Sequence, residues 1–208
     1  MNKLAVSGIG GAIGVLLSVG LVNAVQPNDP YYLQGEQWYL TDKINAPQAW
    51  DIAKGNASDR IAVIDDWNGT DLYGHYHRDL WPKQDPGWDR YPSDQNMRMS
   101  SGMWNAGMAG AETDNGIGMA GLGWNNRLIP IRAAEASIIY PADFAEGIRQ
   151  AVNRGAQILL VCPEAWGPNH PNEDPDVSSG LTDAKNSGRI LIGEAGGDSW
   201  TYRDSTIL

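Results

Sequence analysis

Cysteine is almost absent from this 208-residue chain, since Cys162 stands alone. A single cysteine excludes an internal disulfide and any metal or redox site of the CxxC type. Basic residues are also few, 15 against 25 acidic ones, and the net charge is −10. Phosphate backbones attract positively charged surfaces, so we expect no nucleic-acid partner and assign the negative charge to solubility. The length suits one domain with a sizeable core.

Charge is also missing from a 22-residue apolar run at the amino terminus, residues 4–25. One interpretation is a signal peptide that is cleaved after Ala24. The other is a retained transmembrane helix, because a bilayer core needs ~20 apolar residues in a helix. Small residues that recur every fourth position would let a neighbouring helix approach closely: Gly10, Gly14 and Ser18. Both interpretations divide the chain into residues 1–26 and an exported domain, residues 27–208.

Predicted strands and helices alternate along the remaining chain. Apolar, β-branched runs predict strands at 60–65, 126–133, 157–162 and 189–196. Helical periodicity and terminal glycines predict helices at 45–55, 101–111, 140–156 and 176–188. Residues 27–40, rich in proline and aromatic residues, are expected to wrap over a surface, and residues 66–100 read as loop. This alternation predicts a parallel sheet with helices on both faces.

The order of segments resembles the subtilisin-like serine proteases, or subtilases. "PNDPYYLQGEQWYLTDKINAPQAWD" resembles the start of their mature domain, and "IAVIDD" followed by "HYHRDL" resembles the strand with the catalytic Asp and the turn after it. "GMAGAETDNGIGMAGLGWNNRLIPIRA", "DFAEGIRQAVNRGAQILLV" and "GRILIGEAGGDS" resemble later segments in the same order. The resemblance implies an α/β, reduced subtilisin-like three-layer fold with a mostly parallel sheet, here preceded by one N-terminal hydrophobic helix.

Most of the family's functional positions are altered in this chain. Asp65 matches the catalytic Asp, whereas Ser101 stands where the family has its catalytic His. Residues 162–164 (Cys-Pro-Glu) replace the substrate-binding Ser-Leu-Gly, and Gly197 replaces the oxyanion Asn. The motif around the nucleophilic Ser does not occur before Leu208. A Ser hydroxyl cannot act as a base near neutral pH, so we expect an inactive pseudoenzyme with no catalytic residues and no cofactor.

Other candidate groups have plainer interpretations. His75 and His77 are a weak metal pair without a third ligand and are expected on a surface loop. Gly197-Asp198-Ser199 echoes hydrolytic serines, but no His follows it. Calcium binding near residues 113–118, with help from Asp79, is left open.

Three tryptophans fall beside the altered positions: Trp67, Trp104 and Trp166. Two roles remain open for them. They are expected to fill the unused cleft, or to contact a partner, because Trp is enriched at interface hot spots.

The preferred hypothesis is a non-catalytic accessory or structural subunit, exported and either membrane-anchored or secreted. The resemblance implies further strands beyond residues 189–196, so a protein partner, in a complex of membrane proteins, is expected to cover this sheet edge. A divergent serine hydrolase that uses Ser199 or a His at 75–77 is the second hypothesis. A peptide-binding module is the third.

Overall fold

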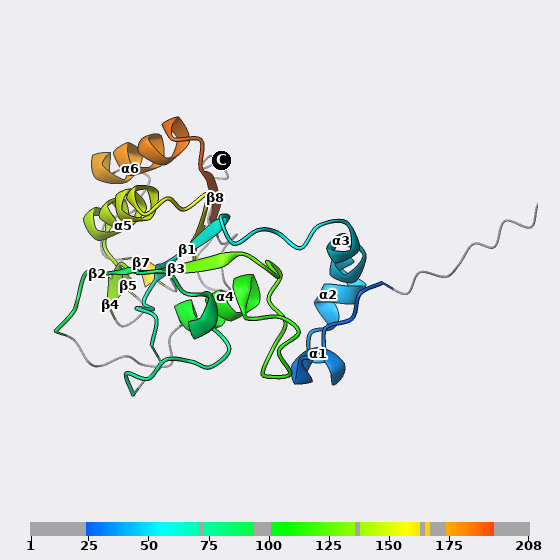
Figure 1. The fold of residues 1–208 in the computed structure, drawn as a ribbon. Helices are drawn as coiled ribbons and strands as arrows, with labels where there is room; N and C mark the ends of the chain where they lie inside the picture. Colours follow the sequence, from blue (N-terminus) through cyan, green and yellow to red (C-terminus); the bar gives the residue numbers. More distant parts are fainter. Residues whose placement is uncertain are drawn as a thin grey trace, which may run out of the picture.

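A five-stranded parallel sheet forms the centre of the molecule, as the computed structural model shows (Figure 1). The structure describes residues 24–70, 73–93, 101–135, 138–162, 165–166 and 174–193. The strand order is β2-β3-β1-β6-β8, and all neighbouring pairs are parallel. The strands of this sheet are β1 (Arg60–Asp65), β2 (Trp88–Asp89), β3 (Arg127–Arg132), β6 (Ile158–Val161) and β8 (Ile190–Gly193). The predicted α/β class with a mostly parallel sheet is therefore confirmed.

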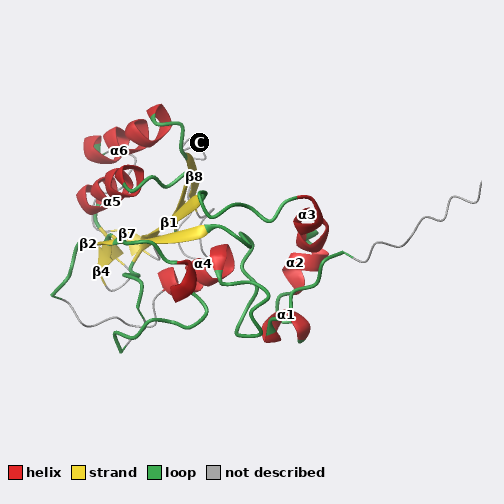
Figure 2. Cartoon of the chain, in the orientation of Figure 1, coloured by secondary structure: helices red, strands yellow, loops and turns green. Residues whose placement is uncertain are grey.

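Helices cover both faces of the sheet (Figure 2). The longer helices are α4 (Ser101–Gly110), α5 (Pro141–Asn153) and α6 (Pro175–Asn186). Figure 1 shows α5 and α6 side by side on one face and α4 on the other, which gives three layers. The four predicted strands and three of the predicted helices match these elements within a few residues.

Alternation along β1 explains why both faces need cover. Ile61 and Val63 pack with α4 in one apolar cluster, whereas Ala62 and Ile64 pack with α5 and α6 in another. Successive side chains of a strand point to opposite faces, so a strand that is apolar throughout is stable only between two layers. β1 is such a strand, and it lies in the middle of the sheet.

The segment before β1 forms a separate small unit beside the sheet. It contains α1 (Pro30–Leu33), α2 (Trp38–Asp42) and α3 (Ala46–Ile52). Only α3 was predicted, because α1 and α2 are too short to show a period. Trp50 of α3 and Trp124 pack edge to face at 5.1 Å, and Gln37 exchanges hydrogen bonds with the backbone of Ala120. Tertiary contacts of this kind stabilise helices too short to form alone.

Smaller elements fill the loops. These are a 3-10 helix, η1 (Trp81–Lys83), and a three-stranded sheet of β4 (Ala134–Glu135), β5 (Ile138–Ile139) and β7 (Ala165–Trp166). No helix in the described ranges is long and apolar enough to cross a membrane. The predicted N-terminal helix, with Gly10, Gly14 and Ser18, lies outside these ranges.

Candidate functional site

The candidate site is built around Asp65, the last residue of β1. Its side chain is fully buried at the edge of the sheet where the parallel strands end. Asp65 Oδ1 accepts hydrogen bonds from the Asp66 backbone N–H at 2.8 Å and from Ser101 Oγ at 3.0 Å. Asp65 Oδ2 accepts one from Asn105 Nδ2 at 3.1 Å. Both oxygens of this carboxylate therefore have hydrogen-bond donors from within the protein.

Helix α4 brings Ser101 to Asp65 because glycine allows a close approach. A Cβ atom built on Gly102 would lie 2.8 Å from Asp65 Cβ and 2.8 Å from Trp67 Cβ. The Gly102 N–H also donates to Asp66 Oδ1 at 3.1 Å. The first turn of α4 is thus fixed against the end of β1, and Ser101, which the sequence resemblance aligns with the histidine of the family, faces the carboxylate.

Asn105 completes the site and was missed at the sequence level. It lies one helical turn after Ser101, and residues four apart in a helix share a face. That spacing was the available signal. Together the two side chains supply both carboxylate oxygens with neutral donors.

The electrostatics of the site favour a protonated carboxyl group. Burial first, and then the neighbouring Asp66 carboxylate, raise the pKa of Asp65, which reaches about 7. Hydrogen bonds from Asp66 N–H, Ser101 and Asn105 lower the pKa but do not offset the loss of solvent. A positively charged imidazole would stabilise the ionised form, whereas Ser and Asn carry no charge.

The tryptophans at the altered positions have different surroundings. Trp67 is fully buried in the cluster between the sheet and α4, so packing, and not partner contact, is the role that the structure gives it. Trp104 is 59% exposed on α4 and remains accessible to a partner. Trp166 lies in β7, and its side chain is outside the described part of the structure.

The remaining predicted positions are only partly described. Cys162 is half-buried after β6. Pro163, Glu164, Gly197 and Ser199 lie outside the described residues. The structure therefore brings Asp65 and Ser101 together and places Cys162 after β6, whereas Pro163, Glu164 and Gly197 are outside its described part.

His75 and His77 lie on an exposed loop, as the sequence predicted. His77 Nδ1 accepts a hydrogen bond from the Asp79 backbone N–H at 3.3 Å. Within the described residues, the Asp65 carboxylate has Asp66, Ser101 and Asn105 as its hydrogen-bond partners, and neither histidine is among them.

The loop of residues 113–118, which was considered for calcium binding, is held in place by hydrogen bonds to two aspartates. Asp29 accepts from the backbone N–H groups of Asp114 and Asn115. Asp79 accepts from Asn115 Nδ2 and from the Met119 backbone N–H. No group of three or more His, Cys, Asp or Glu side chains suited to a metal ion occurs in the described ranges. Calcium prefers six or more oxygen ligands, and the carboxylates of Asp29 and Asp79 already accept hydrogen bonds from this loop.

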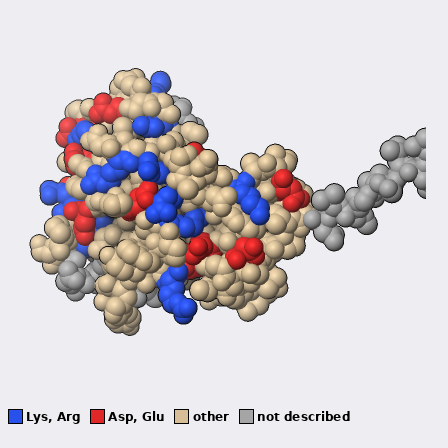
Figure 3. All heavy atoms as spheres, in the orientation of Figure 1, with Lys and Arg blue, Asp and Glu red and all other residues tan. Residues whose placement is uncertain are grey.

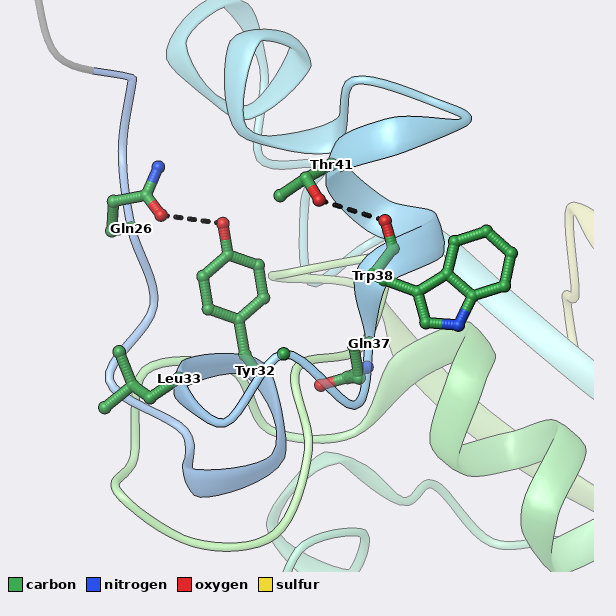
Figure 4. Close-up of a pocket in the computed structure, with 7 residues that line it drawn as sticks. Gln26, Tyr32, Leu33, Gln37, Trp38 and Thr41 are labelled. Carbon is green, nitrogen blue, oxygen red and sulfur yellow. Dashed lines mark hydrogen bonds between the residues drawn. The ribbon is translucent and has the colours of Figure 1, made fainter.

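A small pocket of about 230 Å³ lies at the other end of the molecule, between the segment at Gln26 and helices α1 and α2 (Figure 4). Its polar groups bond within the protein: the Tyr32 hydroxyl donates to Gln26 Oε1 at 2.8 Å, and Thr41 Oγ1 donates to the Trp38 carbonyl at 2.9 Å. These short helices precede β1, whereas Asp65 ends it (Figure 1). The pocket shares no lining residue with the Asp65 site.

The three-layer parallel fold and a buried Asp at the end of a central strand define the class of subtilisin-like serine protease folds. Comparison with known proteins agrees with this class: the Subtilase family model matches residues 59–206. The chain belongs to the subtilase family.

Two curated relatives are similar over most of this chain. Thermitase of Thermoactinomyces vulgaris is 32% identical over 174 residues, which are 82% of this chain and 57% of thermitase. The thermophilic serine proteinase of Bacillus sp. strain AK1 is 32% identical over 86% of this chain and 43% of its own length. The chain thus spans about half the length of these relatives.

Solved structures show the same fold. A protease from Pseudoalteromonas arctica PAMC 21717 matches with a TM-score of 0.62 at 23% identity, over 84% of this chain and 60% of that protein. A lanthipeptide protease matches with a TM-score of 0.61 at 16% identity, over 83% of this chain and 50% of that protein.

Proposed function

We propose that this chain is a non-catalytic accessory or structural subunit of an exported or membrane-anchored assembly, built on a subtilase domain. The observation that carries the proposal is the Ser101–Asp65 hydrogen bond of 3.0 Å. In a serine protease of this kind a histidine takes the proton of the nucleophile, and the Asp orients that histidine. Ser101 occupies the place of that histidine and cannot accept a proton near neutral pH.

The groups that donate hydrogen bonds to the Asp65 carboxylate are all neutral. Both oxygens of Asp65 are engaged by Ser101, Asn105 and a backbone N–H, and burial raises the pKa of Asp65 to about 7. An Asp that orients a catalytic histidine must be ionised, because it stabilises the imidazolium that forms. The surroundings of Asp65 thus support a structural role, in which the carboxyl group joins β1 to α4.

The outer edge of β8 supports the presence of a protein partner. In the described part of the chain β8 pairs with β6 on one side only. Ile190 and Ile192 are 59% and 47% exposed. They pair in register with Ile158 and Leu160 of β6, which pack against the apolar cluster between the sheet and α4. Ile190 and Ile192 thus extend the apolar face of the sheet on the α4 side. Open strand edges and exposed apolar faces favour pairing with another chain.

Native purification in mild detergent tests the subunit proposal. We expect the full chain to copurify with stoichiometric membrane or envelope proteins. Ile192→Glu should release them, whereas Ile44→Glu, at a residue with nearly the same exposed fraction (48%), should not. Purification of the wild-type chain alone would contradict the proposal, and so would equal loss in both variants.

A divergent serine hydrolase is the second candidate, and one observation favours it. A group with a pKa near 7 is well suited to general base catalysis, and Asp65, with a pKa of about 7, accepts a hydrogen bond from the Ser101 hydroxyl. In this alternative Asp65 takes the proton of Ser101 as the hydroxyl attacks. Fluorophosphonate labelling that disappears in Ser101→Ala would support the hydrolase, and absence of labelling in the wild type would exclude this dyad.

A further inference from the structure

An exposed group of aromatic rings lies on the loop of residues 73–81, here called the aromatic loop. Tyr73, Tyr76 and Trp81 are 80%, 54% and 50% exposed. At ~200 Å² for each large aromatic side chain, these fractions leave about 370 Å² of ring surface in solvent. Patches of ~300–600 Å² are the largest on typical monomers and are often functional. This loop is therefore a candidate interaction surface outside the Asp65 site.

The rings are held in place by buried neighbours. Tyr76 and Trp81 stack with ring centroids 3.7 Å apart and an interplanar angle of 32°. Leu80, next to Trp81, is buried in the cluster beneath α4. Two residues further on, Lys83 Nζ donates to the carbonyls of Ala111, Gly123 and Trp124. Trp81 is thus anchored to the core by buried residues on both sides, and Tyr76 is held by its stack on Trp81.

The exposed formal charge of the aromatic loop, that of Arg78, is opposite in sign to the net charge of the whole chain. His75, His77 and Arg78 are exposed, whereas its single acidic residue, Asp79, is buried. The chain as a whole carries a net charge of −10. The loop therefore presents aromatic rings beside one exposed cation, Arg78, which suits contact with an anionic surface.

The shape of the loop favours a deformable partner. In Figure 1 the loop (teal) extends from the lower edge of the molecule, beyond the sheet and α4. In Figure 3 the same edge forms a protruding lobe in which uncharged atoms predominate. A convex lobe with Trp and Tyr at its surface suits the interface of a bilayer, where such rings lie at the level of the headgroups. Nearby cationic side chains gain energy from anionic lipids.

We propose that the aromatic loop binds the surface of an anionic membrane, with Trp81 in the headgroup layer and Arg78 beside lipid phosphates. This inference does not rest on the non-catalytic proposal, because the loop lies outside the Asp65 site. It also does not require the amino-terminal run to be retained.

Quenching by brominated lipids tests the contact directly, because bromine quenches only tryptophans at membrane depth. The full chain is mixed with brominated vesicles that contain phosphatidylglycerol, and its emission is compared with that of Trp81→Phe. Phe preserves the ring stack on Tyr76, so the variant should fold. Residues 1–25 contain no Trp, so insertion of that run alone gives no quenching.

We expect brominated vesicles to quench the emission of Trp81→Phe much less than that of the wild type. The matched control, Trp38→Phe, changes a Trp of similar exposure on α2 and should be quenched as strongly as the wild type. Arg78→Glu, or vesicles of phosphatidylcholine alone, should weaken the quenching. Equal quenching of the wild type and Trp81→Phe would overturn the proposal. So would loss of a copurifying protein in Trp81→Ala without lipid quenching, because the loop would then be a protein interface.

Discussion

Replacement of Asp65 by Asn should stabilise this protein at neutral pH. Burial first, and then the Asp66 carboxylate, raise the pKa of Asp65 from 3.8 to about 7. Each pKa unit corresponds to ~1.4 kcal/mol, so a difference of about 3 corresponds to about 4 kcal/mol of folding free energy. Asparagine has no charge to bury and can accept the hydrogen bond from Ser101. Asp65→Asn should therefore gain stability of this order at pH 7 and above.

The sign of the pH dependence is the reverse of the usual case for an acidic residue. Below pH 3.8 Asp65 is protonated in both the folded and the unfolded chain, so its titration contributes no difference. Between pH 3.8 and about 7 only the unfolded chain ionises, and the wild-type protein loses stability as the pH rises. Above pH 7 the loss is constant. The advantage of Asp65→Asn should thus grow across this window and then level off.

Urea unfolding of the full chain, followed by the fluorescence of its nine tryptophans, measures this difference at several pH values. The wild type and Asp65→Asn should show similar midpoints near pH 4 and diverge toward pH 7. Two results would refute the reasoning: a variant that is less stable than the wild type at pH 7, or a difference that does not change with pH. Either would mean that Asp65 is ionised and well solvated in the folded chain.

Three further substitutions test other parts of the fold by the same assay. Burial alone would raise the pKa of Asp85, but hydrogen bonds from Arg127 and Arg60 lower it. Asp85→Asn should therefore cost roughly 1 kcal/mol of stability at pH 7 after solvent screening, and this cost should vanish below the lowered pKa. A cost that does not change with pH would argue against the two ion pairs. Lys83→Met removes the donor to three backbone carbonyls and should cost roughly 2–3 kcal/mol; a neutral result would mean that water replaces the ammonium group. Gly102→Ala places a Cβ 2.8 Å from Asp65 Cβ and should cost roughly 1–3 kcal/mol through overpacking, so unchanged stability would show that α4 is free to shift.

The sequence was most informative where side chains repeat with a clear period. β1 was predicted with its observed bounds, because residues 61–64 are a continuous apolar run that contains three β-branched side chains. Helix α5 was predicted from the spacing of Phe144, Ile148 and Ala151, which are all buried. In such elements the spacing of apolar residues along the sequence identifies the buried face.

Short elements were missed because long-range contacts determine them. Helices α1 and α2 are 4 and 5 residues long, and their stability depends on contacts such as Gln37 with Ala120, 83 residues apart. β2, only two residues long, is a strand because it pairs with β3. No local pattern carries information of this kind.

The site was predicted in part. The resemblance to subtilases placed Asp65 opposite Ser101, and their hydrogen bond agrees with that placement. The third member, Asn105, was not assigned, although its place one helical turn after Ser101 puts both side chains on the same face of α4. For Trp67 the sequence left two roles open, because a Trp beside an altered site suits an interface as well as a core, and the structure buries it fully.

Peptide hydrolysis by the natively purified assembly tests the central proposal, the absence of a catalytic base, most directly. The wild type is compared with Asp65→Asn and Ser101→Ala over a broad pH range. Loss of the Asp in an active triad lowers turnover by ~10⁴-fold. We predict that all three proteins hydrolyse peptides no faster than the buffer does. Activity of the wild type that falls in either variant would contradict the non-catalytic proposal and identify the Asp65–Ser101 pair as a working site.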